Sequence, residues 1–339
     1  MHYVDCDLRG GTLLAGHAPT SVVAKLADHL GAPQTGARDR AAIEKHAILL
    51  RRSMPWVERI IYTATHEAAM RMVRGVARAA TGRQRIADLS LDNPIDDIAV
   101  AGVTSLSDPA AAMVIRAPNG DPAEAAIGRI KAVIATCREA GTLVIIDDRG
   151  SGLITTPGGF AGRIGVVPDL AVLGGIIGGG LPLAAVVGSA EVIDRARRSA
   201  QATAVQLPLA GDVNALAAVA GQATLEMLEA PGARDRLFET GRAILQSAER
   251  AIGSMPVPAR LTGNSTCFSV HFEADTADMA HRLARRFDSI VEARGVLQAD
   301  RLFYVSLAHD AEAIAHTVAA IAGALESVAD LAERLTAAS

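Results

Sequence analysis

The sequence predicts an α/β protein built around a parallel sheet, and three features support this fold class. Short apolar runs rich in β-branched residues alternate with segments of helical periodicity along the 339 residues. The run Leu143–Ile146 is bounded by charge, which is typical of a buried strand, and it ends in Asp147 and Asp148. The run Val57–Thr63 leads through a tight turn into a helix. Ligands of such sheets bind beyond the carboxyl ends of the strands, so we expect the functional site there.

The other elements follow in chain order. A helix is expected after Gly16–Pro19, and residues 31–39 form a loop because they are rich in Gly, Pro and Thr. In the next helix, expected over Ala41–Arg52, Ile43, Ala47 and Leu50 share one face. Further helices are expected over Ala69–Thr81, Pro122–Ala140, Ala190–Ala202, Ala215–Glu229, from 233 to about 252, Ala277–Arg294 and Ala311–Leu335. Further strands are expected over Ala112–Ile115, Ala184–Val187, Cys267–Phe272 and Phe303–Leu307.

Composition excludes several classes of function. The net charge is −4 with no basic block, so nucleic acid is not an expected partner. No apolar run approaches the roughly 20 residues that span a bilayer, and no signal peptide is visible, so we expect a cytoplasmic protein. Three scattered cysteines do not form a disulfide framework or a metal site. Lysine occurs only at positions 25, 45 and 131.

The turn after the strand predicted over Val57–Thr63 is a candidate anion site. Thr63, Thr65 and His66 lie between the strand and the first turn of the next helix, where free backbone N–H groups and the helix dipole favour phosphate. The dipole disfavours a protonated imidazole at this position, so His66 is a candidate acid–base or donor group. A surface cap is an equally good interpretation of the same histidine.

The stretch around residues 147–151 adds polar candidates. Asp147 and Asp148 point to opposite sides if the strand continues, so only one of them needs to face the site. Arg149 and Ser151 follow directly, and Arg149 is as well explained by an ion pair with Asp148 as by ligand binding. A later segment, from Pro168 to Leu181, contains an apolar run followed by the glycine-rich sequence Gly174–Gly180.

In their order and spacing these motifs resemble the class-III, fold-type I aminotransferases, in particular the glutamate-1-semialdehyde aminomutases. The resemblance extends from about residue 15 to 330. It implies a large domain at 31–249, with a mostly parallel seven-stranded sheet, and a small α/β domain formed by 1–30 and 250–339. It also implies that Asp147 holds the ring nitrogen of pyridoxal phosphate, and that active sites lie at a dimer interface.

The chain departs from the family pattern at the cofactor site. Gly175 stands where the family has the lysine that forms a Schiff base with the cofactor. Ala64, Thr65 and His66 replace the phosphate-binding Ser-Gly-Thr, and Asn93 lies near the position of the aromatic residue that stacks on the ring. In addition, Ala210 replaces a threonine of the family, Arg116 replaces its usual glutamate, and Asn214 is kept.

Three functions are compatible with these departures. The first is an enzyme that works without pyridoxal phosphate, in which Asp147, His66, Asp148 and Arg149 act on a small polar metabolite. The second is a non-catalytic subunit that pairs with an active paralogue. The third uses non-covalent pyridoxamine or pyridoxal phosphate. We favour the first, as a homodimer that binds its ligand through residues at the strand ends, namely Thr63, Thr65, His66, Asn93, Asp147, Ser151, Gly175 and Asn214.

Overall fold

The computed structural model describes residues 3–33, 35–90, 109–118, 124–149, 152–199, 213–299 and 301–337. The chain divides into two compact units. The large unit lies between Ala18 and Leu228, and the small unit combines the segment up to His17 with the segment from Glu229 onward. These boundaries differ from the 31 and 249 implied by the family resemblance, because helix α2 lies with the large unit and helix α10 with the small one.

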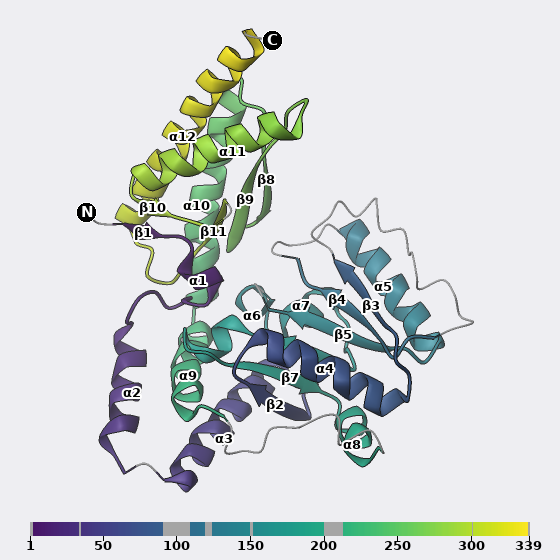
Figure 1. Cartoon of the computed structure of the whole chain (residues 1–339). Coiled ribbons are helices and arrows are strands. Elements are labelled where there is room, and N and C mark those ends of the chain that lie inside the picture. Colours follow the sequence, from purple (N-terminus) through teal and green to yellow (C-terminus); the bar gives the residue numbers. More distant parts are fainter. Residues whose placement is uncertain are drawn as a thin grey trace. The chain divides into compact units, whose positions relative to one another are not determined.

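A six-stranded mixed sheet organises the described part of the large unit (Figure 1). Its order is β2-β7-β6-β5-β4-β3, and β7 runs antiparallel to both of its neighbours while the other pairs are parallel. The strands are β2 Arg59–Thr63, β3 Ile86–Ser90, β4 Ala112–Arg116, β5 Leu143–Asp148, β6 Leu170–Leu173 and β7 Ala184–Gly188. The α/β fold class is therefore confirmed. The described residues contribute six of the seven strands expected, and residues 91–108 lie outside the described ranges.

Helix α4 packs on one face of this sheet and presents its N-terminus to the carboxyl ends of the strands (Figure 1). Its buried face is made of alanine and valine, which lets the helix approach β6 and β7 closely. The helices of this unit are α2 Thr20–Gly31, α3 Gly36–Ser53, α4 His66–Thr81, α5 Glu124–Glu139, α6 Gly152–Thr155, α7 Gly159–Ile164, the short 3₁₀ turn η2 Gly175–Gly178, α8 Ala190–Arg198 and α9 Ala215–Glu229.

The small unit joins the two ends of the chain. The N-terminal strand β1 pairs in parallel with β10, and β8, β9 and β11 form an antiparallel sheet covered by helices. Phe268 and Phe303 stack with ring centroids 5.1 Å apart, and Phe287 packs edge-on against Phe303. The elements are β1 Val4–Asp5, α1 Leu8–Gly11, α10 Ala233–Ser254, β8 Ala259–Asn264, β9 Cys267–Phe272, α11 Ala277–Ala293, β10 Val296–Leu297, β11 Leu302–Tyr304 and α12 Ala311–Ala337.

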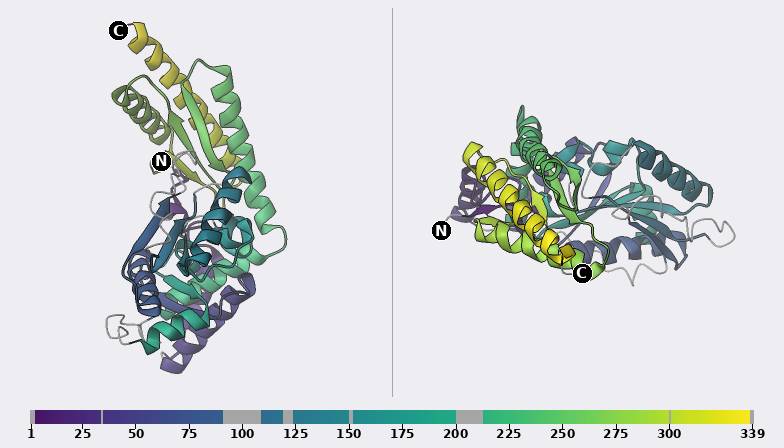
Figure 2. Two further views of the ribbon diagram at one scale, coloured as in Figure 1. Left: turned by 90° about the vertical axis from the view of Figure 1, so that its right-hand side faces the viewer. Right: turned by 90° about the horizontal axis from the view of Figure 1, so that it is seen from above.

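Helix α12 is the one described helix whose length and composition match a membrane span, over Ala311–Leu335. Its residues Ala320, Ala324, Leu325 and Val328 are buried in the core of the small unit. The helix packs beside α10 and α11 (Figure 2). These contacts are those of a core helix in a folded domain, which accounts for its apolar composition.

Candidate functional site

The candidate site lies at the carboxyl edge of the large-unit sheet, where β2, β4, β5 and β6 end. In the strand register, Asp147 of β5 lies opposite Arg116 of β4 and Val172 of β6. Residues opposite each other in a ladder point to the same face, so Arg116 and Asp147 both face α4. The sheet thus delivers an acidic and a basic side chain to the helix N-terminus that carries His66.

Asp147 is the centre of the site. Its side chain is only 2% exposed, and its Oδ1 lies 2.7 Å from His66 Nε2. Its other oxygen, Oδ2, lies 3.7 Å from Nε of Arg116. A buried carboxylate without partners is strongly destabilising, so these two neighbours compensate its charge. The His66 side chain is 21% exposed, and no hydrogen bond to its Nδ1 is formed within the described residues. One ring nitrogen is therefore fixed by Asp147, while the other has no partner among the residues that the structure describes.

The position of His66 is set by the way in which α4 begins. Thr65 is the N-cap, and its hydroxyl oxygen accepts a hydrogen bond of 3.1 Å from the Ala68 N–H. The Thr63 hydroxyl donates to the carbonyl of Thr65 at 3.0 Å. Both threonines that the sequence suggested as ligand groups are thus used to fix the helix start. The backbone N–H groups of His66 and Glu67 lie in the first turn and have no intrahelical acceptor. Together with the helix dipole, they make this edge attractive to anions.

The glycine-rich segment closes the site on the β6 side. Gly174 is extended, and a Cβ placed on it would lie 3.7 Å from the His66 ring and 3.8 Å from Cγ of Arg149. Arg149 is therefore brought next to His66. Its side chain is exposed. Gly175 has a φ of +62°, in the left-handed region, where it begins the 3₁₀ turn.

Behind the glycine-rich segment lies a buried histidine, His46 of α3, which the sequence analysis did not single out. Its Nε2 donates to the Ile177 carbonyl and its Nδ1 accepts from the Tyr62 hydroxyl, each at 2.7 Å. Burial lowers the pKa of His46 to about 4, and the hydrogen bond to the Ile177 carbonyl opposes this shift. A signal was available, since His46 lies on the same apolar face as Ile43 and Leu50.

Asp148 lies on the opposite side of the strand and does not join Asp147. Its Oδ2 accepts a hydrogen bond of 2.8 Å from the Phe160 N–H at the start of α7, and its side chain is buried. Asn214 is an N-cap, because its Oδ1 accepts from the N–H groups of Leu216 and Ala217 at 3.0 and 3.4 Å. These contacts give both residues a structural role in the large unit.

The remaining site candidates, Asn93 and Ser151, lie outside the described residues. Within the described ranges, no three His, Cys, Asp or Glu side chains are close enough together to hold a metal ion.

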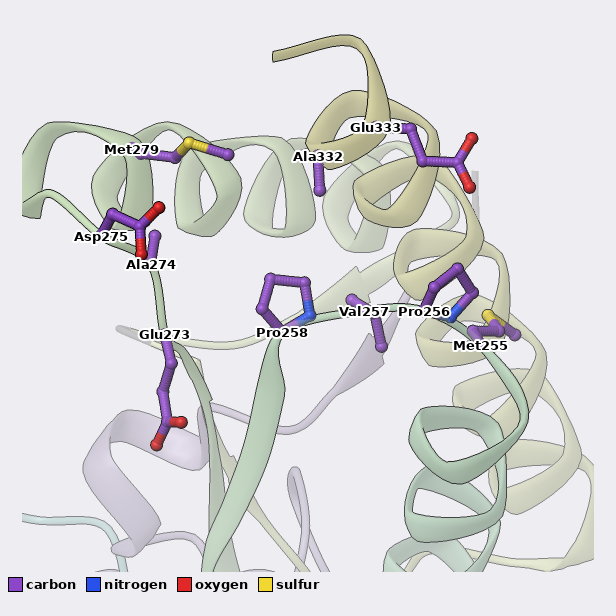
Figure 3. Close-up of a pocket in the computed structure, with 10 residues that line it drawn as sticks. All are labelled: Met255, Pro256, Val257, Pro258, Glu273, Ala274, Asp275, Met279, Ala332 and Glu333. Carbon is purple, nitrogen blue, oxygen red and sulfur yellow. The ribbon is translucent and has the colours of Figure 1, made fainter. Parts of the chain in front are cut away.

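A separate cavity of about 770 Å³ lies in the small unit (Figure 3). Its walls come from the segment that enters β8, the turn into α11 and the last turns of α12, as Figure 3 shows. The lining contains Met255, Val257 and Met279 together with acidic side chains, of which Glu273 pairs with Arg260 at 2.8 Å. None of the residues that the sequence suggested for the site lines this cavity.

Comparison with known proteins gives a consistent result. The family model "Aminotransferase class-III" matches residues 95–321. Glutamate-1-semialdehyde 2,1-aminomutase of Roseiflexus castenholzii is 28% identical over 388 residues, covering 98% of this chain and 88% of the relative. The same enzyme of Pelotomaculum thermopropionicum is 34% identical over 209 residues, covering 56% of this chain and 45% of the relative.

Solved structures share the fold at low sequence identity. An omega-transaminase from Sphaerobacter thermophilus superposes with a TM-score of 0.81 at 22% identity, covering 96% of this chain and 87% of that one. A transaminase with PLP bound superposes with a TM-score of 0.82 at 20% identity, covering 97% of this chain and 87% of that one.

Proposed function

The chain belongs to the class-III aminotransferase family, and we propose that it is a member without Schiff-base chemistry, which moves a proton on a small anionic metabolite with the His66–Asp147 pair. The observation that carries the proposal is the 2.7 Å contact between His66 Nε2 and the buried carboxylate of Asp147. A carboxylate that fixes one ring nitrogen leaves the other poised to give or take a proton.

Pyridoxal phosphate fits these residues poorly, because no lysine amine is placed to hold its aldehyde. The cofactor supplies an electron sink, and the proteins that use it hold its aldehyde through a lysine. Lys25 and Lys45 both pair with Glu226 of α9. Lys131 lies beside Gly165, before β6 begins, whereas the candidate site lies where β6 ends. None of the three lysines therefore occupies the end of β6.

The fit is also poor at the ring nitrogen. A carboxylate normally receives the N–H of the pyridinium ring. Asp147 already receives a donor at Oδ1 from His66 and faces Arg116 at Oδ2, and almost none of its surface is exposed. A pyridinium would have to displace a buried, charge-assisted contact, because both oxygens of Asp147 already have partners among the described residues.

In this proposal each residue has a stated task. Asp147 orients the imidazole of His66, and His66 accepts or donates the proton at its Nδ1. Arg116, Arg149 and the first-turn N–H groups of α4 attract a carboxylate or phosphate group of the substrate. This combination fits proton transfer at a carbon next to a carbonyl, with a second anionic group on the same molecule for binding.

We further propose that the protein is a cytoplasmic homodimer. Its three cysteines are all buried free thiols, as in proteins of reducing compartments. Co-purification with a lysine-bearing class-III relative would instead identify the chain as a subunit of a heteromeric enzyme. A mass measurement on the protein from its native source separates the two assemblies.

The test is hydrogen exchange on a panel of small 2-oxo acids in D₂O, followed by NMR. The wild-type protein is expected to speed loss of the hydrogens next to the carbonyl of at least one member, and His66→Gln to slow that reaction by about 10²-fold or more. His17→Gln is a matched control, because His17 Nε2 lies 2.7 Å from Asp5 Oδ2 in the small unit. Exchange that survives His66→Gln, or that is absent across the panel, contradicts the proposal. So does a borohydride-fixed vitamin B6 adduct on this chain.

A further inference from the structure

The His66 ring occupies the hydrogen-bonding position at Asp147 that a nitrogen heterocycle would need. The carboxylate is buried, and its two oxygens face donors from within the chain, Nε2 of His66 and Nε of Arg116. The donor at Oδ1 is an aromatic ring N–H, which is the same chemical group that a pyridinium or imidazolium ligand presents. His66 therefore makes the same ring N–H hydrogen bond to Asp147 that a bound nitrogen heterocycle would make.

The ring is held in this position by its surroundings. His66 is the first residue of α4, whose start is fixed by the Thr65 cap. On its other side lies Gly174, where an added Cβ would be 3.7 Å from both Cβ and Cδ2 of the histidine. The imidazole thus packs between the end of β5 and the backbone that follows β6. A ring so confined excludes a second ring from the same place by volume as well as by hydrogen bonding.

We propose that His66 is the specificity-determining residue of the site: it excludes ring-nitrogen cations from Asp147, and it selects ligands that bind through anionic or carbonyl oxygens. Such ligands can accept from the free ring nitrogen, from Arg116 and from Arg149, without disturbing the buried carboxylate. This inference deepens the proposed function, because it names the ligand chemistry that the same site admits and refuses.

The proposal predicts that removing the ring creates a heterocycle site. In His66→Ala the buried carboxylate loses its donor at Oδ1 and gains a space of the size of an imidazole beside that oxygen. Imidazole, 4-methylpyridine and pyridoxamine 5′-phosphate are the probes, and binding is measured by calorimetry and by the shift in melting temperature. At least one probe is expected to bind His66→Ala ten-fold or more tightly than the wild type.

Three further variants make the result specific. The double variant His66→Ala/Asp147→Asn should lose the gain, because the carboxylate that receives the ring N–H is gone. His17→Ala, which breaks a histidine–aspartate pair of the same length at an exposed place, should show no gain. His66→Ser provides a smaller cavity with a hydroxyl, in case the alanine variant does not fold, and it should give the same ranking of probes.

Two outcomes overturn the inference: wild type that binds the probes as tightly as His66→Ala, or His66→Ala and His66→Ser that both bind none of them. Neither outcome depends on the hydrogen exchange experiment. Exclusion of heterocycles by His66 is therefore tested separately from proton transfer by His66, and either can fail alone.

Discussion

Helix α9 contacts the glycine-rich segment at Gly221, and we predict that a larger residue at this position destabilises the protein. A Cβ placed on Gly221 would lie 1.9 Å from the Ile177 carbonyl oxygen and 2.7 Å from Nε2 of His46. Ordinary carbon–oxygen contacts are well over 3 Å, so Gly221→Ala must push the Ile177 carbonyl away from α9 and strain its hydrogen bond to His46. The same substitution at Gly128 of α5 meets no atom within 4 Å.

The two substitutions should have opposite effects on stability. Overpacking costs about 1–3 kcal/mol, and loss of the His46–Ile177 hydrogen bond adds about 1 kcal/mol. Alanine regains about 1 kcal/mol over glycine in a helix interior. Gly221→Ala should therefore destabilise the large unit by about 1–3 kcal/mol, whereas Gly128→Ala should stabilise it by about 0.5–1 kcal/mol.

Urea unfolding followed by tryptophan fluorescence measures both effects. Trp56 is the only tryptophan of the chain and lies in the large unit just before β2, so its signal reports the unit that carries both glycines. A lower midpoint for Gly221→Ala and a higher one for Gly128→Ala, with unchanged slopes, are the expected results. Equal midpoints for the two variants would show that the α9 contact is looser than these distances imply.

Two other predictions concern the residues around the glycine-rich segment. Because the folded-state pKa of His46, about 4, lies below the ordinary value of 6.5, only the unfolded chain takes up this proton between those two pH values. Unfolding free energy should therefore fall as pH drops through that window, by up to about 3 kcal/mol from this group, and His46→Gln should flatten the profile. Gly175→Lys should not create a pyridoxal phosphate enzyme, because position 175 has a φ of +62° and His66 still occupies Asp147. A borohydride-stable adduct on the new lysine, found by peptide mass analysis, is the contrary result.

The sequence predicted the strands that have an unbroken apolar or β-branched run, including β2 at the end of the sheet order opposite to β3, and it missed β3 and β8. Leu143–Ile146 and Ala184–Val187 are nearly continuous apolar runs, as expected for strands covered on both faces, and both lie inside the sheet. Strand β3, in contrast, lies at one end of the sheet order and carries Asp88, which pairs with Arg74 of α4. Strand β8 is an edge strand of the small-unit sheet and is only partly buried. Strands that carry charged or half-exposed side chains lack the apolar pattern on which sequence prediction depends.

The sequence predicted which elements carry the candidate residues, but not the contacts between those residues. Asp147 and His66 could each be assigned to the end of a strand or the start of a helix, yet they are 81 positions apart and no local pattern joins them. Thr65 and Asn214 were candidates for ligand binding, whereas the structure uses both as helix caps. Hydroxyl and amide side chains before a helical run have this local use, and it competes with ligand binding in every such sequence.

The substitutions at the site are best understood as one linked change. A buried aspartate at the end of β5 is stable only if a donor meets it, and under our proposal that donor is not a pyridinium. His66 and Arg116 meet the carboxylate from α4 and β4 instead. This makes the imidazole the structural partner of the aspartate and, under our proposal, also the group that meets a ligand. A residue with only the first task would not need to present its second ring nitrogen, which has no hydrogen-bond partner among the described residues, at the edge of the sheet.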